Sequence, residues 1–431
     1  MGETCADPGR IAVLSHVHPS LSRGGAEIAA HTLFSGLREI GVDAIFVAAC
    51  PEQDRARLRL GSARERVVHV DAGGYDAFYH IAAPEVLAQL GRIVAADGVR
   101  LLNFHHFLNF GVNSLRALGV PAVLTLHEFL AVCHHSGQMV TRPARHLCAE
   151  ATAEACATCF PERGAGRFAM RRRFLLEALG ALQGFVSPSR FLAGRMADWG
   201  LPRERMAVVE NGLRDASPPA PPKPPGEEPW IFGYFGQINP FKGVELLLEA
   251  AALVEADAEL AGRVRIRIHG VMIGQPPEFV ERFQAAVARH ACLDFVGAYD
   301  NASVGRLMRA CDYVVVPSTW WENSPMVIQE AFQAGRPVLC SDIGGMAEKV
   351  VDGVSGLQFR VGNRHDLLRA MRAAVQPGVQ AGLCAGLPAV SDRVAMARAY
   401  LAAFANFGVS LPASAAPSRP SPAPGPAVSA P

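Results

Sequence analysis

The sequence has no apolar run long enough to cross a bilayer, and its first residues, MGETCADPGR, lack the apolar stretch of a signal peptide. It also has little net charge, because 41 basic residues against 40 acidic ones leave a formal charge of +1. No global field therefore favours nucleic acid, and we expect no nucleic-acid partner. Charged residues make up 19% and hydrophobic residues 50% of the chain, which is typical of a globular protein. Together these features predict a cytoplasmic protein.

Short apolar runs alternate with helical patterns in both halves of the 431-residue chain. Such alternation predicts α/β domains with parallel sheets, which we place at residues 8–212 and 230–375. The predicted linker, residues 213–229, contains SPPAPPKPPGEEP, whose seven prolines exclude a helix or a central strand. A last helix is expected at 391–408, and a disordered tail rich in Pro, Ala and Ser at 411–431. Two open parallel sheets would share a cleft at the carboxyl ends of their strands, where ligands bind.

The segment VVVPSTWWENSPMVIQEAFQAGRPVLCSD, residues 314–342, carries the densest set of candidate ligands. It predicts a strand that ends before Pro317 and a helix that begins with a Ser324 cap followed by Pro325. The amide groups of Met326 and Val327 would then form an anion site in the cleft. Glu322 precedes this helix and Glu330 lies inside it, so that the two carboxylates flank the expected anion. This arrangement suits a diphosphate with hydroxyl groups at both ends.

The Glu-x7-Glu pattern, with Pro325 and the following AFQAGRPVLCSDIGGMAE, resembles the retaining glycosyltransferases of family 4, which have the GT-B fold. The resemblance covers nearly the whole chain up to the last helix. It implies two Rossmann-like domains facing a cleft, and transfer of a sugar from a nucleoside diphosphate sugar to a hydroxyl group with retention of anomeric configuration. The acceptor would be a sugar or a lipid-linked molecule, in the synthesis of a polysaccharide, glycolipid or other glycoconjugate. Catalysis would need no cofactor.

Within this resemblance, Glu322 would bind the sugar hydroxyls and Glu330 the ribose hydroxyls. The opening of the second domain, FGYFGQINPFKGVELLLEA, places Lys242 at a turn, where it can neutralise the leaving diphosphate. The family has an arginine just after the first glycine of this segment, and this chain has Gln237 instead, which removes one fixed positive charge. In front of the first predicted helix, Gly24 and Gly25 match the glycine pair that the family places near the donor phosphates.

Histidines follow two of the predicted strands of the first domain. His127, in VLTLHEF, matches the family's histidine that faces the donor sugar and the bond that breaks. His105 and His106, in LLNFHHF, follow the preceding strand, and the sequence does not decide which of them lines the cleft. No DxD motif stands at a strand end, which agrees with a metal-independent enzyme of this kind.

Four cysteines lie in one predicted loop, residues 133–159. Cys156 and Cys159 have the C-x2-C spacing of a metal site, and Cys133 and Cys148 complete a set of four. A structural zinc that fixes the loop beside the acceptor side is one interpretation, and four reduced or buried thiols are the other. The remaining cysteines are expected to be small core residues.

A basic helical pattern at 167–173 contains Arg167, Arg171, Arg172 and Arg173 among apolar residues. Such a helix is typical of peripheral contact with the inner face of a membrane, of contact with an acidic acceptor, or of a plain solvated surface. Two other functions also remain open. One is a nucleotide-sugar epimerase of the same shape, and the other is a non-catalytic sugar-nucleotide-binding subunit, which Gln237 makes conceivable. The sequence does not favour a dehydrogenase, because no G-x-G-x-x-G dinucleotide-binding motif follows a predicted strand.

Overall fold

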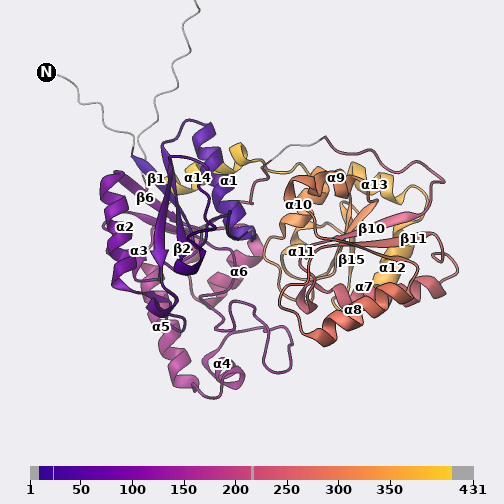
Figure 1. Ribbon diagram of the computed structural model, residues 1–431, viewed down its shortest axis with the longest axis horizontal. Helices are drawn as coiled ribbons and strands as arrows, with labels where there is room; N and C mark the ends of the chain where they lie inside the picture. The colour runs from indigo at the N-terminus through magenta and orange to yellow at the C-terminus, as the bar shows by residue number, and fades with distance from the viewer. Residues whose placement is uncertain (1–8, 23, 215–217, 410–431) are drawn as a thin grey trace, which may run out of the picture.

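The computed structural model describes residues 9–22, 24–214 and 218–409. Two α/β lobes lie side by side, each built on its own sheet (Figure 1). The predicted tail at 411–431 and residues 1–8 lie outside the described part of the chain. None of the helices in the described ranges is long and apolar enough to cross a membrane.

The N-terminal lobe contains a sheet of seven parallel strands among its described residues, in the order β3-β2-β1-β6-β7-β8-β9. Strands inside the sheet, such as Arg10–Ser15 and Ala44–Pro51, are buried on both faces and therefore read as nearly continuous apolar runs rather than as alternating ones. Its strands are β1 (Arg10–Ser15), β2 (Ala44–Pro51), β3 (Glu65–Val70), β6 (Val99–Phe104), β7 (Ala122–Thr125), β8 (Gly184–Ser187) and β9 (Met206–Val208), with a small antiparallel pair, β4 (Tyr75–Asp76) and β5 (Ile81–Ala82). Its helices are α1 (Gly25–Glu39), α2 (Pro84–Ala96), α3 (Ser114–Ala117), α4 (Ala153–Cys159), α5 (Ala165–Gly180) and α6 (Arg190–Trp199).

The C-terminal lobe repeats this architecture with six parallel strands in its described residues, in the order β12-β11-β10-β13-β14-β15. The strands are β10 (Trp230–Phe235), β11 (Val264–His269), β12 (Leu293–Gly297), β13 (Tyr313–Val316), β14 (Val338–Ser341) and β15 (Gly356–Phe359). The helices are α7 (Val244–Ala256), α8 (Pro277–Arg289), α9 (Val304–Arg309), α10 (Met326–Gln333), α11 (Gly344–Lys349), α12 (Arg364–Ala374) and α13 (Val379–Ala385). In both sheets the strand order reverses beside the first strand, which is where ligands of such folds bind. The predicted fold class is confirmed.

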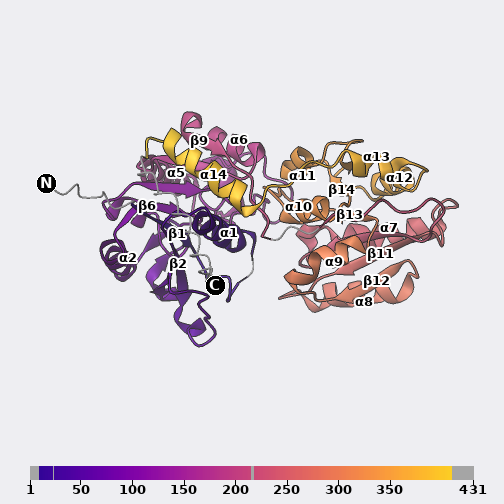
Figure 2. The same cartoon turned by 90° about the horizontal axis from the view of Figure 1, so that it is seen from above.

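The last helix, α14 (Arg393–Asn406), leaves the C-terminal lobe and packs on the N-terminal one (Figure 2). Met396, Tyr400 and Phe404 are buried in the same core cluster as strand β1 and helix α1. The contact is close, since a side chain at Gly36 of α1 would meet the carbonyl oxygen of Arg393 at 2.1 Å. The chain therefore crosses between the lobes twice, and the predicted last helix supports the N-terminal lobe.

Candidate functional site

A cleft of about 590 Å³ lies between the two lobes, at the carboxyl ends of their strands. Residues of both lobes form its walls, including ten of the eleven predicted catalytic and donor-binding residues: Gly24, Gly25, His127, Gln237, Lys242, Glu322, Ser324, Pro325, Met326 and Val327. The fold thus brings together motifs that are up to about 300 residues apart in the sequence.

An ion pair between Lys242 and Glu322 occupies the C-terminal wall of the cleft. Oε1 of Glu322 accepts hydrogen bonds from Nζ of Lys242 at 2.7 Å, from Oγ of Ser318 at 2.8 Å and from Nε1 of Trp320 at 2.8 Å. Glu322 is only 8% exposed. Burial alone would raise the pKa of its carboxyl, but the charge of Lys242 and these hydrogen bonds outweigh burial and lower the pKa. Glu322 is therefore held as a carboxylate.

Lys242 reaches this position from a tight turn between β10 and α7. Oδ1 of Asn239 accepts a hydrogen bond from the amide of Lys242, and Gly243 follows with a φ of 71°. A side chain at Gly243 would lie 1.8 Å from the carbonyl oxygen of Pro317, so only glycine lets the turn pack against the end of β13. The Lys242 ammonium also lies 5.4 Å from the ring centre of Trp320. One ammonium proton faces Glu322, which leaves others for an anion in the cleft.

Helix α10 points its N-terminus into the cleft, although it begins differently from the prediction. Its first residue is Met326, and Pro325 is the N-cap rather than the first helical residue. The predicted Ser324 cap is wrong: within the described ranges, its hydroxyl is buried and has no hydrogen-bond partner. The amides of Met326 and Val327 remain free of a side-chain cap there, which leaves them available to an anion.

Glu330 lies one turn further along α10 and is the predicted residue that falls outside the described lining of the cleft. Burial raises the pKa of its carboxyl to about 7. Near neutral pH this group therefore exists in both protonation states, unlike Glu322.

Two histidines form a hydrogen-bonded pair on the N-terminal wall of the cleft. His127 lines the cleft, and its Nε2 lies 2.9 Å from Nδ1 of His105, which is buried behind it. The ring of His105 stacks on Tyr400 of α14, with 6.0 Å between the ring centres and 8° between the planes. Burial lowers the pKa of His127 well below its usual value, and the neighbouring histidines lower it further. His127 is thus a neutral hydrogen-bonding group whose position depends on the last helix.

His106 also lines the cleft, so both histidines of the LLNFHHF motif belong to the site. Nδ1 of His106 accepts a hydrogen bond from the amide of Leu108 at 2.9 Å, and its Nε2 lies 3.1 Å from Oε1 of Glu128. In the neutral ring the proton must therefore sit on Nε2, where it is donated to Glu128. The sequence reasoning missed Glu128 and His16, whose ring lies 4.5 Å from that of His106. His16 directly follows β1 and Glu128 lies three residues after β7, and a place just beyond a strand end is the signal that could have found both.

The glycine pair and Gln237 occupy opposite walls. Gly24 is the N-cap of α1, and a side chain there would lie 2.6 Å from Oε2 of Glu27, so the two pack closely. Gln237 lines the cleft, and its carbonyl oxygen accepts a hydrogen bond from the hydroxyl of Tyr234 at 2.6 Å. An amide side chain thus stands where the family resemblance places a guanidinium.

Hydrogen bonds connect the two lobes around the cleft. The side-chain amide of Asn323 donates to the carbonyl oxygen of His127 at 3.0 Å, which ties the Glu322 loop to the opposite wall. The carboxylate of Glu348 accepts from the backbone amides of Arg190 and Phe191 at 2.8 and 2.6 Å, at the start of α6. These hydrogen bonds hold the predicted site residues of the two lobes on facing walls of one cleft.

The four clustered cysteines are free thiols, of which Cys133 is buried and Cys148, Cys156 and Cys159 are partly buried. Burial raises the pKa of Cys156 to about 12, and the charges of Cys133, Cys148 and Cys159 add to this effect. Within the described residues, however, no group of three or more His, Cys, Asp or Glu side chains is arranged to hold a metal ion. A zinc site at these cysteines therefore stays a prediction.

The basic stretch does not form one basic face, because Arg171 is buried. Its guanidinium donates to the carbonyl oxygens of Phe78, Leu130 and Ala131 at 2.7 to 2.9 Å. Burial lowers its pKa to about 10. This arginine is therefore an internal clamp of the N-terminal lobe, and only Arg167, Arg172 and Arg173 are exposed.

Two family models match consecutive parts of the chain. The model described as Glycosyltransferase Family 4 matches residues 23–216, and that described as Glycosyl transferases group 1 matches residues 220–378. A D-inositol 3-phosphate glycosyltransferase of Geodermatophilus obscurus is 25% identical over 399 residues, which cover 86% of this chain and 83% of the relative. One of Stackebrandtia nassauensis is 31% identical over 145 residues, which cover 33% of this chain and only 32% of the relative.

Solved structures share the two-lobed fold. The Anabaena protein HepE in complex with UDP and glucose has a TM-score of 0.66 at 18% identity, covering 92% of this chain and 99% of that one. Sucrose-phosphate synthase from Thermosynechococcus elongatus has a TM-score of 0.69 at 18% identity, with the same shares covered. Two facing α/β lobes, each built on its own parallel sheet, define a GT-B fold. The chain belongs to glycosyltransferase family 4, in the glycosyl transferases group 1, and is a glycosyltransferase.

Proposed function

We propose that the protein transfers a sugar from a nucleoside diphosphate sugar to a hydroxyl group of an acceptor, with retention of anomeric configuration. The observation that supports this most is the Lys242–Glu322 ion pair beside the open N-terminus of α10. A cation and free amides suit a diphosphate, and a fixed carboxylate next to them suits the hydroxyls of the attached sugar.

In this proposal the residues of the cleft act by positioning and by stabilising charge. Lys242 and the amides of Met326 and Val327 stabilise the negative charge that develops on the departing diphosphate. Glu322 and His127 orient the sugar. Glu330, which lies on α10 behind the described lining of the cleft, accepts hydrogen bonds from the ribose hydroxyls. The diphosphate oxygen that leaves takes the proton of the attacking hydroxyl on the same face, so the new bond forms with the old configuration and no covalent enzyme intermediate is needed.

Binding of activated sugars tests the donor class. Since the solved complex of HepE contains UDP, UDP-glucose is the first donor to compare with GDP-mannose and ADP-glucose by thermal shift and calorimetry. We expect one of them to raise the melting temperature by several degrees at saturation. No binding of any of the three, nor of the free nucleotides, would falsify the proposed function. NMR of the anomeric proton in the product then reports retention or inversion.

The same assays separate the two alternatives. An epimerase converts the donor sugar without an acceptor, so that donor alone would yield a new sugar. A non-catalytic subunit, which Gln237 in the cleft wall makes conceivable, would bind the donor without turnover across an acceptor panel.

Zinc at Cys133, Cys148, Cys156 and Cys159 is proposed only as a structural element of the loop that carries them. Its support is that, beside burial, the charges of neighbouring thiols of this set raise the pKa of Cys133, Cys148 and Cys156. Elemental analysis of protein purified without chelator should find one zinc per chain, and a Cys156→Ser, Cys159→Ser variant should lose it. Finding less than a tenth of an equivalent of zinc in the unmodified protein refutes the zinc site.

Membrane contact through α5 is likewise a proposal. It no longer includes Arg171, because that residue is buried. Arg167 and Arg173 are exposed, and Met170 between them is 63% exposed. Co-sedimentation with vesicles containing an anionic phospholipid tests the contact, and equal recovery of an Arg167→Glu, Met170→Ser variant contradicts it.

A further inference from the structure

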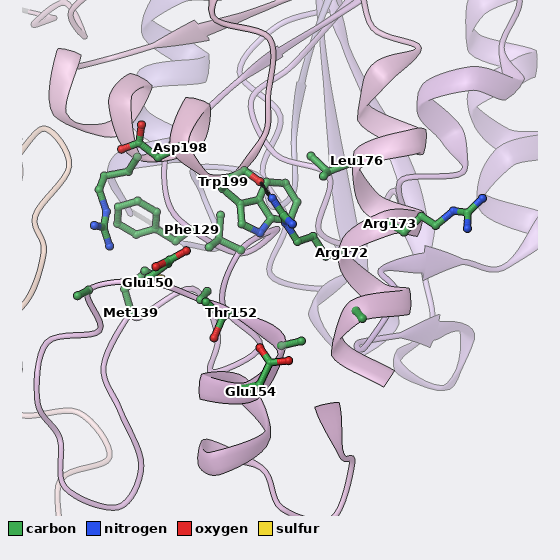
Figure 3. Close-up of a pocket in the computed structure, with 16 residues that line it drawn as sticks. Phe129, Met139, Glu150, Thr152, Glu154, Arg172, Arg173, Leu176, Asp198 and Trp199 are labelled. Carbon is green, nitrogen blue, oxygen red and sulfur yellow. Dashed lines mark hydrogen bonds between the residues drawn. The ribbon is translucent and has the colours of Figure 1, made fainter. Parts of the chain in front are cut away.

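A second cavity, of about 800 Å³, lies in the N-terminal lobe between helices α5 and α6 and the segment 149–154 (Figure 3). We call it the loop pocket. The residues described as lining it do not overlap with those of the donor cleft. Its volume falls in the range of small-molecule sites, about 300–1,000 Å³. It is therefore large enough for a ligand of its own.

Opposite charges face the loop pocket from different walls. Arg172 of α5 reaches toward Trp199, whereas Glu150 and Glu154 come from the segment below (Figure 3). Arg195 of α6 is a further lining residue. In the described part of the chain no ion pair joins these arginines to these glutamates. Their charged groups are thus separated by the cavity.

The arginines are held in place by main-chain contacts instead. Arg172 donates to the carbonyl oxygen of Trp199 at 2.8 Å, and Arg195 donates to that of Cys148 at 3.0 Å. Each guanidinium keeps further N–H groups for a ligand, because it has five in all. The positions of the two groups are therefore set before a ligand arrives.

The chemistry of these walls matches a polyhydroxyl ligand. The described lining holds three arginines, Arg172, Arg173 and Arg195, and three acidic residues, Glu150, Glu154 and Asp198. Their charges balance, so the pocket does not favour a strongly anionic or cationic molecule. A sugar hydroxyl both donates and accepts, so it can bond a carboxylate on one side and a guanidinium on the other. Leu176 and Trp199 add an apolar wall suited to the C–H face of a sugar ring.

Only a thin wall separates the loop pocket from the donor cleft. The guanidinium of Arg195 lies 5.5 Å from the ring centre of Trp321, which lines the cleft. Trp321 in turn donates from its Nε1 to the carbonyl oxygen of Cys148 at 3.2 Å. Phe129 of the loop pocket directly follows Glu128 of the cleft. The two cavities are thus neighbours, divided by the side chains of Arg195 and Trp321.

We propose that the loop pocket binds about two or three sugar residues of a saccharide acceptor whose reacting hydroxyl lies in the donor cleft. This inference rests on the proposed function, and it narrows the acceptor to an existing glycan rather than a single small polyol or a lipid headgroup. The protein then extends a saccharide chain.

Binding to an array of α- and β-linked gluco-, galacto- and manno-oligosaccharides of one to four residues tests the pocket. We expect the full-length protein to bind at least one oligosaccharide, and more tightly than the corresponding monosaccharide. Arg172→Gln and Glu150→Gln should each weaken that binding at least tenfold. Their matched controls, Arg167→Gln on the same helix and Glu162→Gln outside the pocket, should bind like the unmodified protein.

Donor binding is measured in parallel on every variant, together with circular dichroism to confirm folding. Unchanged donor binding in Arg172→Gln and Glu150→Gln shows that any loss is specific to the loop pocket. Failure to bind any oligosaccharide, or equal binding by the pocket variants, overturns this inference while donor binding stays intact. Failure of the unmodified protein to bind any donor refutes the proposed function instead.

Discussion

Nζ of Lys242 lies 2.7 Å from Oε1 of Glu322, and this ion pair joins the two segments that line the C-terminal wall of the cleft. Lys242 precedes helix α7 and Glu322 precedes helix α10, so that the pair fixes two loops from different strands. From the sequence, Glu322→Ala is expected to remove transfer and leave the fold intact. The structure changes that expectation, because the carboxylate also accepts hydrogen bonds from Ser318 and Trp320.

The first prediction therefore uses Glu322→Gln and Lys242→Met. Each should lower kcat by at least about a hundredfold, because the pair orients the sugar and neutralises the diphosphate. Each should also lower the melting temperature, since the other member keeps a charge without its partner. Steady-state kinetics and thermal unfolding measure both effects.

The double variant shows whether the two residues act together. If they form one unit, Glu322→Gln combined with Lys242→Met should be little worse than either single change. Losses in kcat that multiply would mean that the two side chains act independently, contrary to this interpretation.

Glu330 predicts how donor binding depends on pH. Its carboxyl has a pKa raised to about 7 by burial, so it is mostly protonated at pH 6 and mostly ionised at pH 8. If the carboxylate accepts hydrogen bonds from the ribose hydroxyls, affinity for the donor should fall as the pH decreases from 8 to 6. A nucleoside diphosphate sugar gains no proton in this range, so calorimetry at several pH values isolates the protein group.

Glu330→Gln is the control for this pH dependence, and its donor affinity should be nearly constant between pH 6 and 8. A raised carboxyl pKa also means that unfolding releases a proton between about pH 4.5 and 7. The unmodified protein should therefore lose stability relative to Glu330→Gln as the pH rises through that window. The same pH profile in both proteins would contradict the assignment.

Much of the site could be predicted from the sequence because each motif lies in the segment between the end of a strand and the next helix. Lys242, Glu322 and His127 need only the parallel-sheet rule to be placed in one cleft. The dependence of His105 on Tyr400 could not be predicted, since it requires the last helix to cross back to the first lobe. The burial of Arg171 could not be predicted for a similar reason. Its carbonyl partners come from segments distant in sequence, which the periodicity of its own helix does not reveal.

The support of the histidine pair by α14 leads to a third prediction. Tyr400→Leu removes the stacking on His105 and the hydroxyl contact with Thr125, so that His105 and His127 lose their fixed orientation. We expect kcat to fall at least about tenfold while donor affinity changes less than twofold. Phe404→Leu is the matched control, because it lies in the same core cluster and is not stacked on His105. An equal loss of kcat in both variants would assign the effect to general destabilisation.

The last prediction concerns the stability of the N-terminal lobe. Arg171→Met keeps an unbranched apolar stem but removes the donors for the carbonyl oxygens of Phe78, Leu130 and Ala131. Because buried polar groups without partners are costly, the free energy of unfolding should fall by at least about 2 kcal/mol. Arg167→Met, on the exposed side of the same helix, should change it by less than about 0.5 kcal/mol. Urea unfolding followed by circular dichroism measures both, and equal midpoints for the two variants would show that Arg171 does not clamp the lobe.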